Sequence, residues 1–304
     1  MAHIAIEPDV SGRAAVVSTV SETARAKVNL SLQVLGKRDD GYHELDSIVA
    51  FAEFGDEVLF DPRGEPGFSI AGPFATALDG PNLIETAADA LRAWFGKALP
   101  GRFTLTKRIP VAAGLGGGSA DAAAAIRAMA RAYELAVEAT PEFHAYLAKI
   151  GADVPVCLSQ APSRMTGIGE IVTILPRFIE MPVVLVNPGV PLSTREVFAA
   201  LGARHFQQSD APATTAPAWT DADAAIEDLL QRHNHLEAPA MQLRPVIAEV
   251  LAALRSQPLC RLARLSGSGP TCFGVFASPA QAEDAAARIA NGNQRWWVQA
   301  TALR

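Results

Sequence analysis

The sequence has little that would connect it to a membrane, to nucleic acid or to an oxidising compartment. No apolar run approaches the roughly 18 residues of a membrane-spanning helix, and the opening stretch, with Glu7 and Asp9, does not resemble a signal peptide. The net charge of −6 argues against nucleic acid, which is bound through basic faces. Cys157, Cys260 and Cys272 are too scattered for a disulfide framework or a metal site. We therefore expect a cytoplasmic protein in a reducing environment, with no nucleic-acid or membrane partner.

Apolar residues, by contrast, are plentiful. They make up 49% of the 304 residues, which is enough for a large core and favours two domains. We expect a flexible extension at residues 1–22, a first domain at 23–175 and a second domain at 176–304. The expected strands and helices alternate without the regular period of a doubly wound sheet, so the predicted fold class is α+β.

Sequence periodicity predicts the individual elements. From Ala24 to Val34 apolar and polar residues alternate, which indicates a half-buried strand. Further strands are expected at 42–54, 57–60, 102–107, 183–186, 271–276 and 296–302. Helices are expected at 81–95, 120–135, 141–150, 194–201, 221–232, 236–240, 244–256 and 279–290. Residues 206–220, rich in Pro, Ala and Thr, are expected to form a mobile loop.

A glycine-rich loop, Gly114–Ala120, is the strongest functional signal. It joins a predicted strand to an alanine-rich helix, where glycines let backbone N–H groups approach a ligand and the helix start favours an anion. It is not a P-loop, since no lysine follows the glycines, and Ser119 stands where a dinucleotide fingerprint needs glycine. We expect Ser119 to cap the helix, with Asp121 in its first turn. The pattern favours a phosphate site over a glycine-rich turn without a ligand.

Two short segments near the N-terminus carry further candidate side chains. Lys27 and Asn29 lie two residues apart on one strand, so both leave the same face. They suit a negatively charged or hydroxylated ligand, although a solvated strand face would give the same pattern. Tyr42 and His43 follow a polar turn and could stack on a planar group and bind its edge, or could simply fill surface or core space.

A third candidate is Asp153, which follows a predicted helix and precedes an apolar stretch. Pro155 is expected to hold Val154 in an extended conformation. A poorly solvated acid is suited to act as a general base, but taken alone this spacing favours a loop aspartate that makes a turn hydrogen bond. His233 and His235 have no acidic or cysteine partner nearby in sequence, so no metal site is predicted.

Three motifs in order resemble the GHMP kinase superfamily. They are A-K-V-N-L at 26–30, P-V-A-A-G-L-G-G-G-S-A at 110–120 and L-S-G-S-G-P-T at 265–271. The resemblance implies two domains, an N-terminal ribosomal-S5-like domain that binds ATP and substrate and a C-terminal ferredoxin-like α/β sandwich with added helices. Three more segments are similar to the branch that acts on a cytidyl diphosphate sugar alcohol: G-K-R-D-D-G-Y-H-E-L at 36–45, G-A-D-V-P at 151–155 and G-I-G-E at 167–170.

The resemblance also implies a reaction and roles for individual residues. The reaction is ATP-dependent phosphorylation of the 2-hydroxyl of the methylerythritol unit, in the non-mevalonate route to isoprenoids. Lys27 and Asp153 would be catalytic, with Asp153 as the base. The ATP-binding residues would be Asn82, Pro110, Val111, Ala112, Ala113, Gly114, Leu115, Gly116, Gly117, Gly118, Ser119 and Ala120. The substrate-binding residues would be Asn29, Tyr42, His43, Thr194 and Phe198.

The implied cofactors are ATP and Mg²⁺, in a monomer or a homodimer, with no dedicated metal ligands in the protein. Three alternatives remain open. One is a sibling kinase for mevalonate or homoserine, although neither substrate carries a base that Tyr42 could stack on. The second is a ligand-sensing relative without turnover, which would have no use for Lys27 beside Asp153. The third, a dinucleotide-dependent oxidoreductase, is disfavoured by Ser119.

Overall fold

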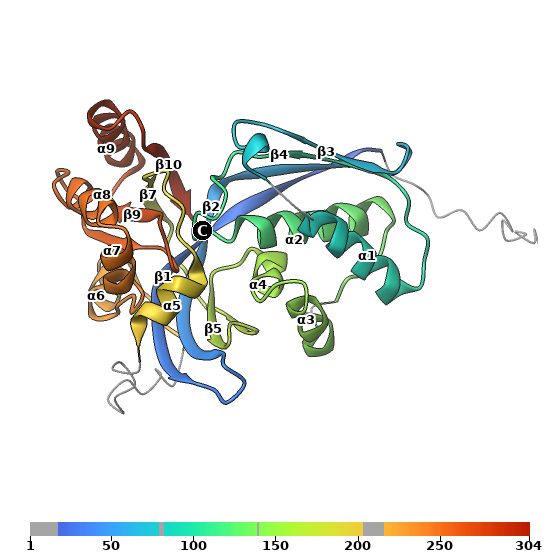
Figure 1. The fold of residues 1–304 in the computed structure, drawn as a ribbon, viewed down its shortest axis with the longest axis horizontal. Helices are drawn as coiled ribbons and strands as arrows, with labels where there is room; N and C mark the ends of the chain where they lie inside the picture. Colours follow the sequence, from blue (N-terminus) through green and yellow to red (C-terminus); the bar gives the residue numbers. More distant parts are fainter. Residues whose placement is uncertain (1–17, 79–81, 139, 203–215) are drawn as a thin grey trace, which may run out of the picture.

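A long β-hairpin joins the two halves of the protein in a computed structural model, which describes residues 18–78, 82–138, 140–202 and 216–304 (Figure 1). The strands are β1 (Val20–Lys37), β2 (His43–Asp61), β3 (Gly67–Ala71), β4 (Arg102–Thr106), β5 (Ser163–Gly167), β6 (Ile171–Ile174), β7 (Met181–Asn187), β8 (Leu262–Leu265), β9 (Cys272–Val275) and β10 (Trp297–Leu303). The helices are α1 (Leu83–Phe95), α2 (Gly117–Ala132), α3 (Pro141–Ala148), α4 (Val154–Ser159), α5 (Thr194–Leu201), α6 (Ala222–Gln231), α7 (Glu237–Leu243), α8 (Val246–Arg255) and α9 (Pro279–Gly292), with a 3₁₀ turn at Ala75–Ala77.

The strands form one mixed sheet in two parts. Its order is β3-β4-β2-β10-β7-β9-β8, with β1 and β5 also paired to β2 and β6 paired to β5. Leu303 of β10 pairs with Ala52 of β2, and this single register pair connects the first six strands to the last four. Figure 1 shows α1 to α4 gathered on one side of the β1–β2 hairpin and the C-terminal helices on the other.

The N-terminal core lies between the sheet and α2. This helix is rich in alanine, and its buried side chains are small enough for it to pack closely on β1, β2, α1 and α4. Phe51, Phe60 and Leu105 from the sheet and Leu91 from α1 complete this core. The glycine loop, Gly114–Ala120, continues into the first turn of α2, so the packing of the helix fixes the position of the loop.

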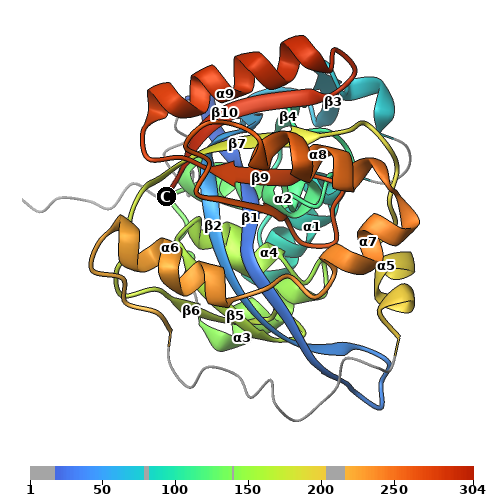
Figure 2. The same ribbon diagram turned by 90° about the vertical axis from the view of Figure 1, so that its left-hand side faces the viewer.

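The C-terminal core is built on β7 to β10. In Figure 2, where this half faces the viewer, α8 and α9 lie over these strands and the β1–β2 hairpin continues past them. Val184 and Val186 of β7 pack with Leu251 of α8 and Ile289 of α9. Because the hairpin contributes Leu32 and Val34 to the same cluster, the two halves share apolar contacts along β1.

Several sequence predictions were wrong in detail. The strands expected at 42–54 and 57–60 are one strand, β2, since Gly55 has no Cβ to collide with the backbone of Ala24 at 2.3 Å. The short strands β3, β5 and β6 were not predicted. Val154 is helical rather than extended, because Pro155 falls in the first turn of α4, where its missing N–H costs nothing.

The helix after the glycine loop also begins earlier than expected. Gly116 is the N-cap of α2, in the left-handed conformation, and there is no side-chain cap, so the prediction that Ser119 caps the helix was wrong. Residues 20–22 of the predicted extension belong to β1. Residues 1–17, and residues 206–215 of the predicted loop, lie outside the described residues, whereas Trp219 of that loop is buried and donates to Asp228 at 2.9 Å. In the described part of the chain, no helix is long and apolar enough to span a membrane.

Candidate active site

The glycine loop is held against two other segments by its backbone. Lys27 N donates to Leu115 O at 2.9 Å, and Thr271 N donates to Ala113 O at 3.2 Å. A Cβ at Gly114, whose φ is +75°, would lie 2.6 Å from Gly269 O, so this close approach requires glycine. The loop is therefore fixed between β1 and the turn at 266–269 that follows β8.

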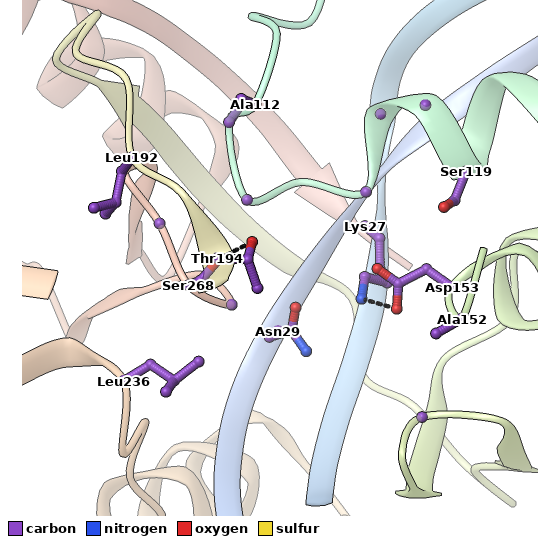
Figure 3. A pocket seen from close by; sticks show the side chains of 18 of the residues that line it. Lys27, Asn29, Ala112, Ser119, Ala152, Asp153, Leu192, Thr194, Leu236 and Ser268 are labelled. Carbon is purple, nitrogen blue, oxygen red and sulfur yellow. Dashed lines mark hydrogen bonds and ion pairs between the residues drawn. The ribbon is translucent and has the colours of Figure 1, made fainter. Parts of the chain in front are cut away.

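An ion pair lies beside this loop. Lys27 Nζ of β1 is 2.7 Å from Asp153 Oδ1, and the two side chains are 4% and 33% exposed (Figure 3). Asp153 is the N-cap residue of α4, but its side chain does not cap the helix and instead reaches Lys27. A Cβ at Gly116 would be 3.3 Å from Lys27 Cε and 3.8 Å from Asp153 Oδ2, so the loop backbone lies directly beside the pair.

The turn at 266–269 completes the opposite wall. Ser266 Oγ accepts from Asn29 N and donates to Gly114 O, both at 3.1 Å, so it joins β1 to the glycine loop. Asn234 Nδ2 donates to Leu265 O and Gly267 O and holds the turn from behind. Thr194 Oγ1 and Ser268 Oγ are 2.8 Å apart, which links α5 to the turn (Figure 3).

These segments enclose a pocket of about 620 Å³. Most of the predicted site residues line it: Lys27, Asn29, Pro110, Val111, Ala112, Ala113, Gly114, Gly116, Gly117, Gly118, Ser119, Asp153, Thr194 and Phe198. Leu115 and Ala120 instead bury their side chains in the core. Glycine loop, ion pair and hydroxyl-bearing residues therefore face a single cavity, which is large enough for a nucleotide and part of a second ligand.

Besides Leu115 and Ala120, three predicted residues lie outside the lining: Asn82, Tyr42 and His43. Asn82 caps α1, since its Oδ1 accepts from Ile84 N at 2.8 Å, although its neighbour Leu83 lines the pocket. Tyr42 is 59% exposed at the end of the β1–β2 hairpin. His43 stacks on Phe198, with ring centroids 4.7 Å apart and planes 25° from parallel. Partial burial, and then the charge of Lys37, lower the pKa of His43, which favours the neutral ring.

The structure also adds residues to the predicted site. Lys107, Ser47, Met165 and Ser268 all line the pocket. Ser47 Oγ accepts from Asn29 Nδ2 at 2.7 Å and so orients the amide. The motif at 265–271 was a signal for Ser268, but neither Lys107 nor Ser47 belongs to a pattern that distinguishes it from an ordinary strand or loop residue.

Comparisons with known proteins agree with this site. The family profile of the GHMP kinases N-terminal domain matches residues 82–161, which include the glycine loop and Asp153. The profile of the GHMP kinases C-terminal domain matches residues 221–294. Two relatives named 4-diphosphocytidyl-2-C-methyl-D-erythritol kinase are similar over nearly the whole chain. The Bradyrhizobium diazoefficiens protein is 46% identical, over 93% of this chain and 97% of its own. The Paracoccus denitrificans protein is 50% identical, over 93% and 96%.

The chain belongs to the GHMP kinase family. A crystal structure of 4-(cytidine 5'-diphospho)-2C-methyl-D-erythritol kinase has a TM-score of 0.73 and 32% identity, and covers 93% of this chain and 99% of that one. A homoserine kinase from Cytophaga hutchinsonii has a TM-score of 0.66 at 15% identity, over 99% of this chain and 97% of its own, and shares the fold. The expected α+β, two-domain GHMP kinase fold is thus confirmed. The fold places the glycine loop and the Lys27–Asp153 pair in one pocket.

GHMP kinases use ATP as phosphate donor, and the lining of the pocket has the donors that phosphates need. Gly117 and Gly118 open α2, so their N–H groups are not used within the helix. Among the described residues, no group of three or more His, Cys, Asp or Glu side chains is placed to hold a metal ion.

Proposed function

We propose that the protein transfers the terminal phosphoryl group of ATP to the 2-hydroxyl of 4-diphosphocytidyl-2-C-methyl-D-erythritol. The observation that carries the proposal is the Lys27–Asp153 pair, 2.7 Å apart and directly beside the glycine loop. The names of the relatives, at 46% and 50% identity over most of the chain, support the choice of acceptor. Phosphoryl transfer depends on positioning and charge stabilisation, and both functions have candidates in this pocket.

In the proposed reaction Asp153 accepts the proton of the acceptor hydroxyl as that oxygen attacks phosphorus. Its carboxylate is one-third exposed, so a substrate oxygen can approach the side that Lys27 does not occupy. Lys27, nearly buried, stabilises the negative charge that develops on the attacking oxygen. Asn29 and Thr194 hold the sugar alcohol from the facing strand and helix.

The donor half of the pocket is assigned to ATP. We assign Pro110 to Ala120 to the triphosphate, through backbone N–H groups at the start of α2. Asn82 and the lining residue Leu83 lie at the start of α1, where we place the adenine. Mg²⁺ enters on the phosphates and supplies additional positive charge there.

The cytidyl group is assigned to the aromatic side chains near the hairpin end. Phe198 lines the pocket, and the ring of His43 stacks on the ring of Phe198. Tyr42 directly precedes His43, the first residue of β2. A pyrimidine between Tyr42 and Phe198 would gain stacking on both faces and a hydrogen bond from the neutral imidazole. This arrangement requires the His43–Phe198 contact to open when the substrate binds.

The proposal also covers the domain boundary, the cellular location and the oligomeric state of the protein. We assign residues 23–175 to the domain that carries most of the site and 176–304 to the second domain, with the boundary between β6 and β7. The three cysteines are free thiols, as expected in the cytoplasm. A monomer or a homodimer would each leave the pocket complete, because all of its assigned residues come from one chain.

An ADP-release assay with a panel of acceptors tests the function. Purified protein with Mg-ATP is offered 4-diphosphocytidyl-2-C-methyl-D-erythritol, mevalonate or homoserine. Turnover with the cytidyl substrate alone is expected. Turnover with another acceptor would contradict the cytidyl assignment, and bound ATP without turnover on any acceptor would favour a sensing relative.

A further inference from the structure

A buried cluster of three charged side chains lies behind the glycine loop, and none of the three has a role in the reaction proposed above. Lys107 Nζ donates to Asp56 Oδ2 at 2.5 Å and to Asp121 Oδ2 at 2.7 Å. The three residues are 2%, 0% and 3% exposed. With both carboxylates ionised the cluster carries one uncompensated negative charge, which is costly in a buried site.

The two carboxylates are not equivalent. Asp56 Oδ1 accepts from the backbone N–H groups of Arg108 and Ile109, at 2.5 and 2.8 Å, in addition to the bond from Lys107 to its other oxygen. Asp121 accepts a hydrogen bond from Lys107 at Oδ2 but none from a backbone N–H group, and its Oδ1 has no partner among the described residues. Hydrogen bonds to a carboxylate favour its ionised form, so the proton that would neutralise the cluster belongs on Asp121.

The electrostatics agree with this geometry. Burial raises the pKa of Asp121 to about 7, with Lys107 opposing the rise and Asp56 adding to it. Burial works against the ammonium group, but Asp121 and Asp56 outweigh it and raise the pKa of Lys107, so the lysine stays charged. Asp121 is therefore the group in this cluster that changes charge near neutral pH.

The other charged groups near α2 are paired with another residue or exposed to solvent, so Asp121 is the group whose protonation state can change. The helix packs against β1, β2, α1 and α4. On β1, Lys27 is held by Asp153 and Glu22 pairs with Arg127 of α2 itself; on β2, Glu57 pairs with Arg108 at the surface. Glu85 and Asp89 of α1 are exposed. On α4, burial and then the charge of Asp153 raise the pKa of Cys157 to about 12, which keeps the thiol neutral.

The cluster is adjacent to the loop that we assign to the phosphates. Lys107 lines the pocket, and a Cβ at Gly117 would lie 3.2 Å from Lys107 Nζ and 3.9 Å from Asp56 Oδ2. Phosphates bound to the loop would thus bring several negative charges close to a cluster that already carries one uncompensated negative charge. Since the three cluster side chains are almost fully buried, this repulsion is weakly screened and favours protonation.

We propose that nucleotide binding to the glycine loop is coupled to the uptake of one proton by the Asp56–Lys107–Asp121 cluster, with Asp121 as the protonated residue. The inference rests on the proposed placement of ATP. Asp121 is a positioning residue in this scheme. Its neutral form lets Lys107 remain beside Gly117 without an excess of negative charge next to the phosphates.

Isothermal titration calorimetry tests the coupling. ADP with excess Mg²⁺ is titrated into the whole protein at pH 7.5 in buffers that differ in ionisation enthalpy. The dependence of the observed heat on buffer enthalpy gives the number of protons taken up. About three-quarters of a proton per nucleotide is expected at most for the wild type, because a pKa of about 7 leaves about a quarter of the free protein already protonated at pH 7.5. Asp121→Asn keeps the shape of the side chain and is expected to bind ADP with no proton uptake. Asp89→Asn, on the exposed face of α1, is the matched control and is expected to behave like the wild type.

The outcomes separate this proposal from the proposed function. Nucleotide binding without proton uptake in the wild type, or unchanged uptake in Asp121→Asn, would overturn the coupling and leave the ATP site intact. Absence of ADP binding to the wild type would overturn the ATP assignment itself. If Asp121→Asn folds poorly, proton uptake by the wild type is compared at pH 7.5 and pH 5.5. Uptake through this cluster must be smaller at pH 5.5, where the cluster already holds the proton before the nucleotide binds, and equal uptake at the two pH values would overturn the coupling.

Discussion

At the residue scale, the site depends on backbone positions that only glycine can occupy. Gly114 combines a φ of +75° with carbonyl oxygens 2.6 and 2.8 Å from where its Cβ would stand. We expect Gly114→Ala to separate the loop from the turn at 266–269, to lower ATP affinity at least tenfold and to destabilise the fold by about 1–3 kcal/mol. Gly36→Ala is the matched control, since no described heavy atom lies within 4 Å of its added Cβ. Equal ATP affinity in both variants would contradict the fixed loop.

A second residue-scale prediction concerns the aromatic pair. Phe198→Ala removes the ring that His43 stacks on and that lines the pocket. Loss of one stacking face costs about 1–3 kcal/mol, so KM for the cytidyl substrate is expected to rise by about 5–100-fold while KM for ATP stays the same. Steady-state kinetics with each substrate varied in turn measures the two effects. Equal increases would place Phe198 outside the base subsite.

At the element scale, Arg264 shows how separate elements are joined behind the site. Its guanidinium, nearly buried on β8, donates to Leu30 O of β1, to Leu229 O of α6 and to Arg232 O, at 2.6 to 2.8 Å. Burial lowers the pKa of Arg264 to about 10, yet the side chain remains charged at neutral pH. Arg264→Met would leave three carbonyls without this donor and is expected to cost about 2–4 kcal/mol of unfolding free energy.

The control for Arg264 is its neighbour Arg261. That arginine pairs with Asp223, whose side chain is 81% exposed, so Arg261→Met is expected to cost less than about 1 kcal/mol. Urea denaturation of both variants measures the difference. Similar midpoints would mean that the Arg264 hydrogen bonds do not join these elements in an energetically important way.

The elements differed in how well the sequence predicts them. The strand from Ala24 to Val34 and the alanine-rich helix were recognisable because each has a continuously buried apolar face. The prediction that the strand is half-buried was wrong, since Lys27, Asn29 and Ser31 on its polar face are buried as well. The strands β5 and β6 were not recognisable, since each has five residues or fewer and depends on tertiary pairing, of β5 with β2 and of β6 with β5. Lys107 could not be predicted as a site residue, because its partners Asp56 and Asp121 are brought together only by the folded sheet and helix.

At the scale of the whole molecule, the buried cluster predicts a pH dependence of stability. The pKa of Asp121 is about 7 in the folded protein against an ordinary value of 3.8, so the folded state holds the extra proton between these values. Its contribution to stability is fully present below pH 3.8 and is lost as the pH rises through about 7. Asp121→Asn removes this loss. The unfolding free energy of the variant minus that of the wild type should therefore increase from pH 5 to pH 8, by no more than about 4 kcal/mol.

Denaturant titrations at several pH values measure that difference. Asp89→Asn, exposed on α1, is expected to show a difference that does not change with pH over the same range. A difference for Asp121→Asn that is constant or decreases with pH would show that Asp121 is ionised throughout, which would also remove the basis for proton uptake.

The fold brings three separate segments, the glycine loop, Lys27 and Asp153, into one pocket. Within that pocket, the proposed reaction depends most on Asp153 as the base. The most direct measurement is the kcat of Asp153→Asn with the cytidyl substrate, together with its affinity for ATP. We expect kcat to fall by about 10²–10⁴-fold while ATP affinity changes less than about threefold, because asparagine cannot accept the proton. A kcat within a few-fold of the wild type would contradict the role of Asp153 as the base.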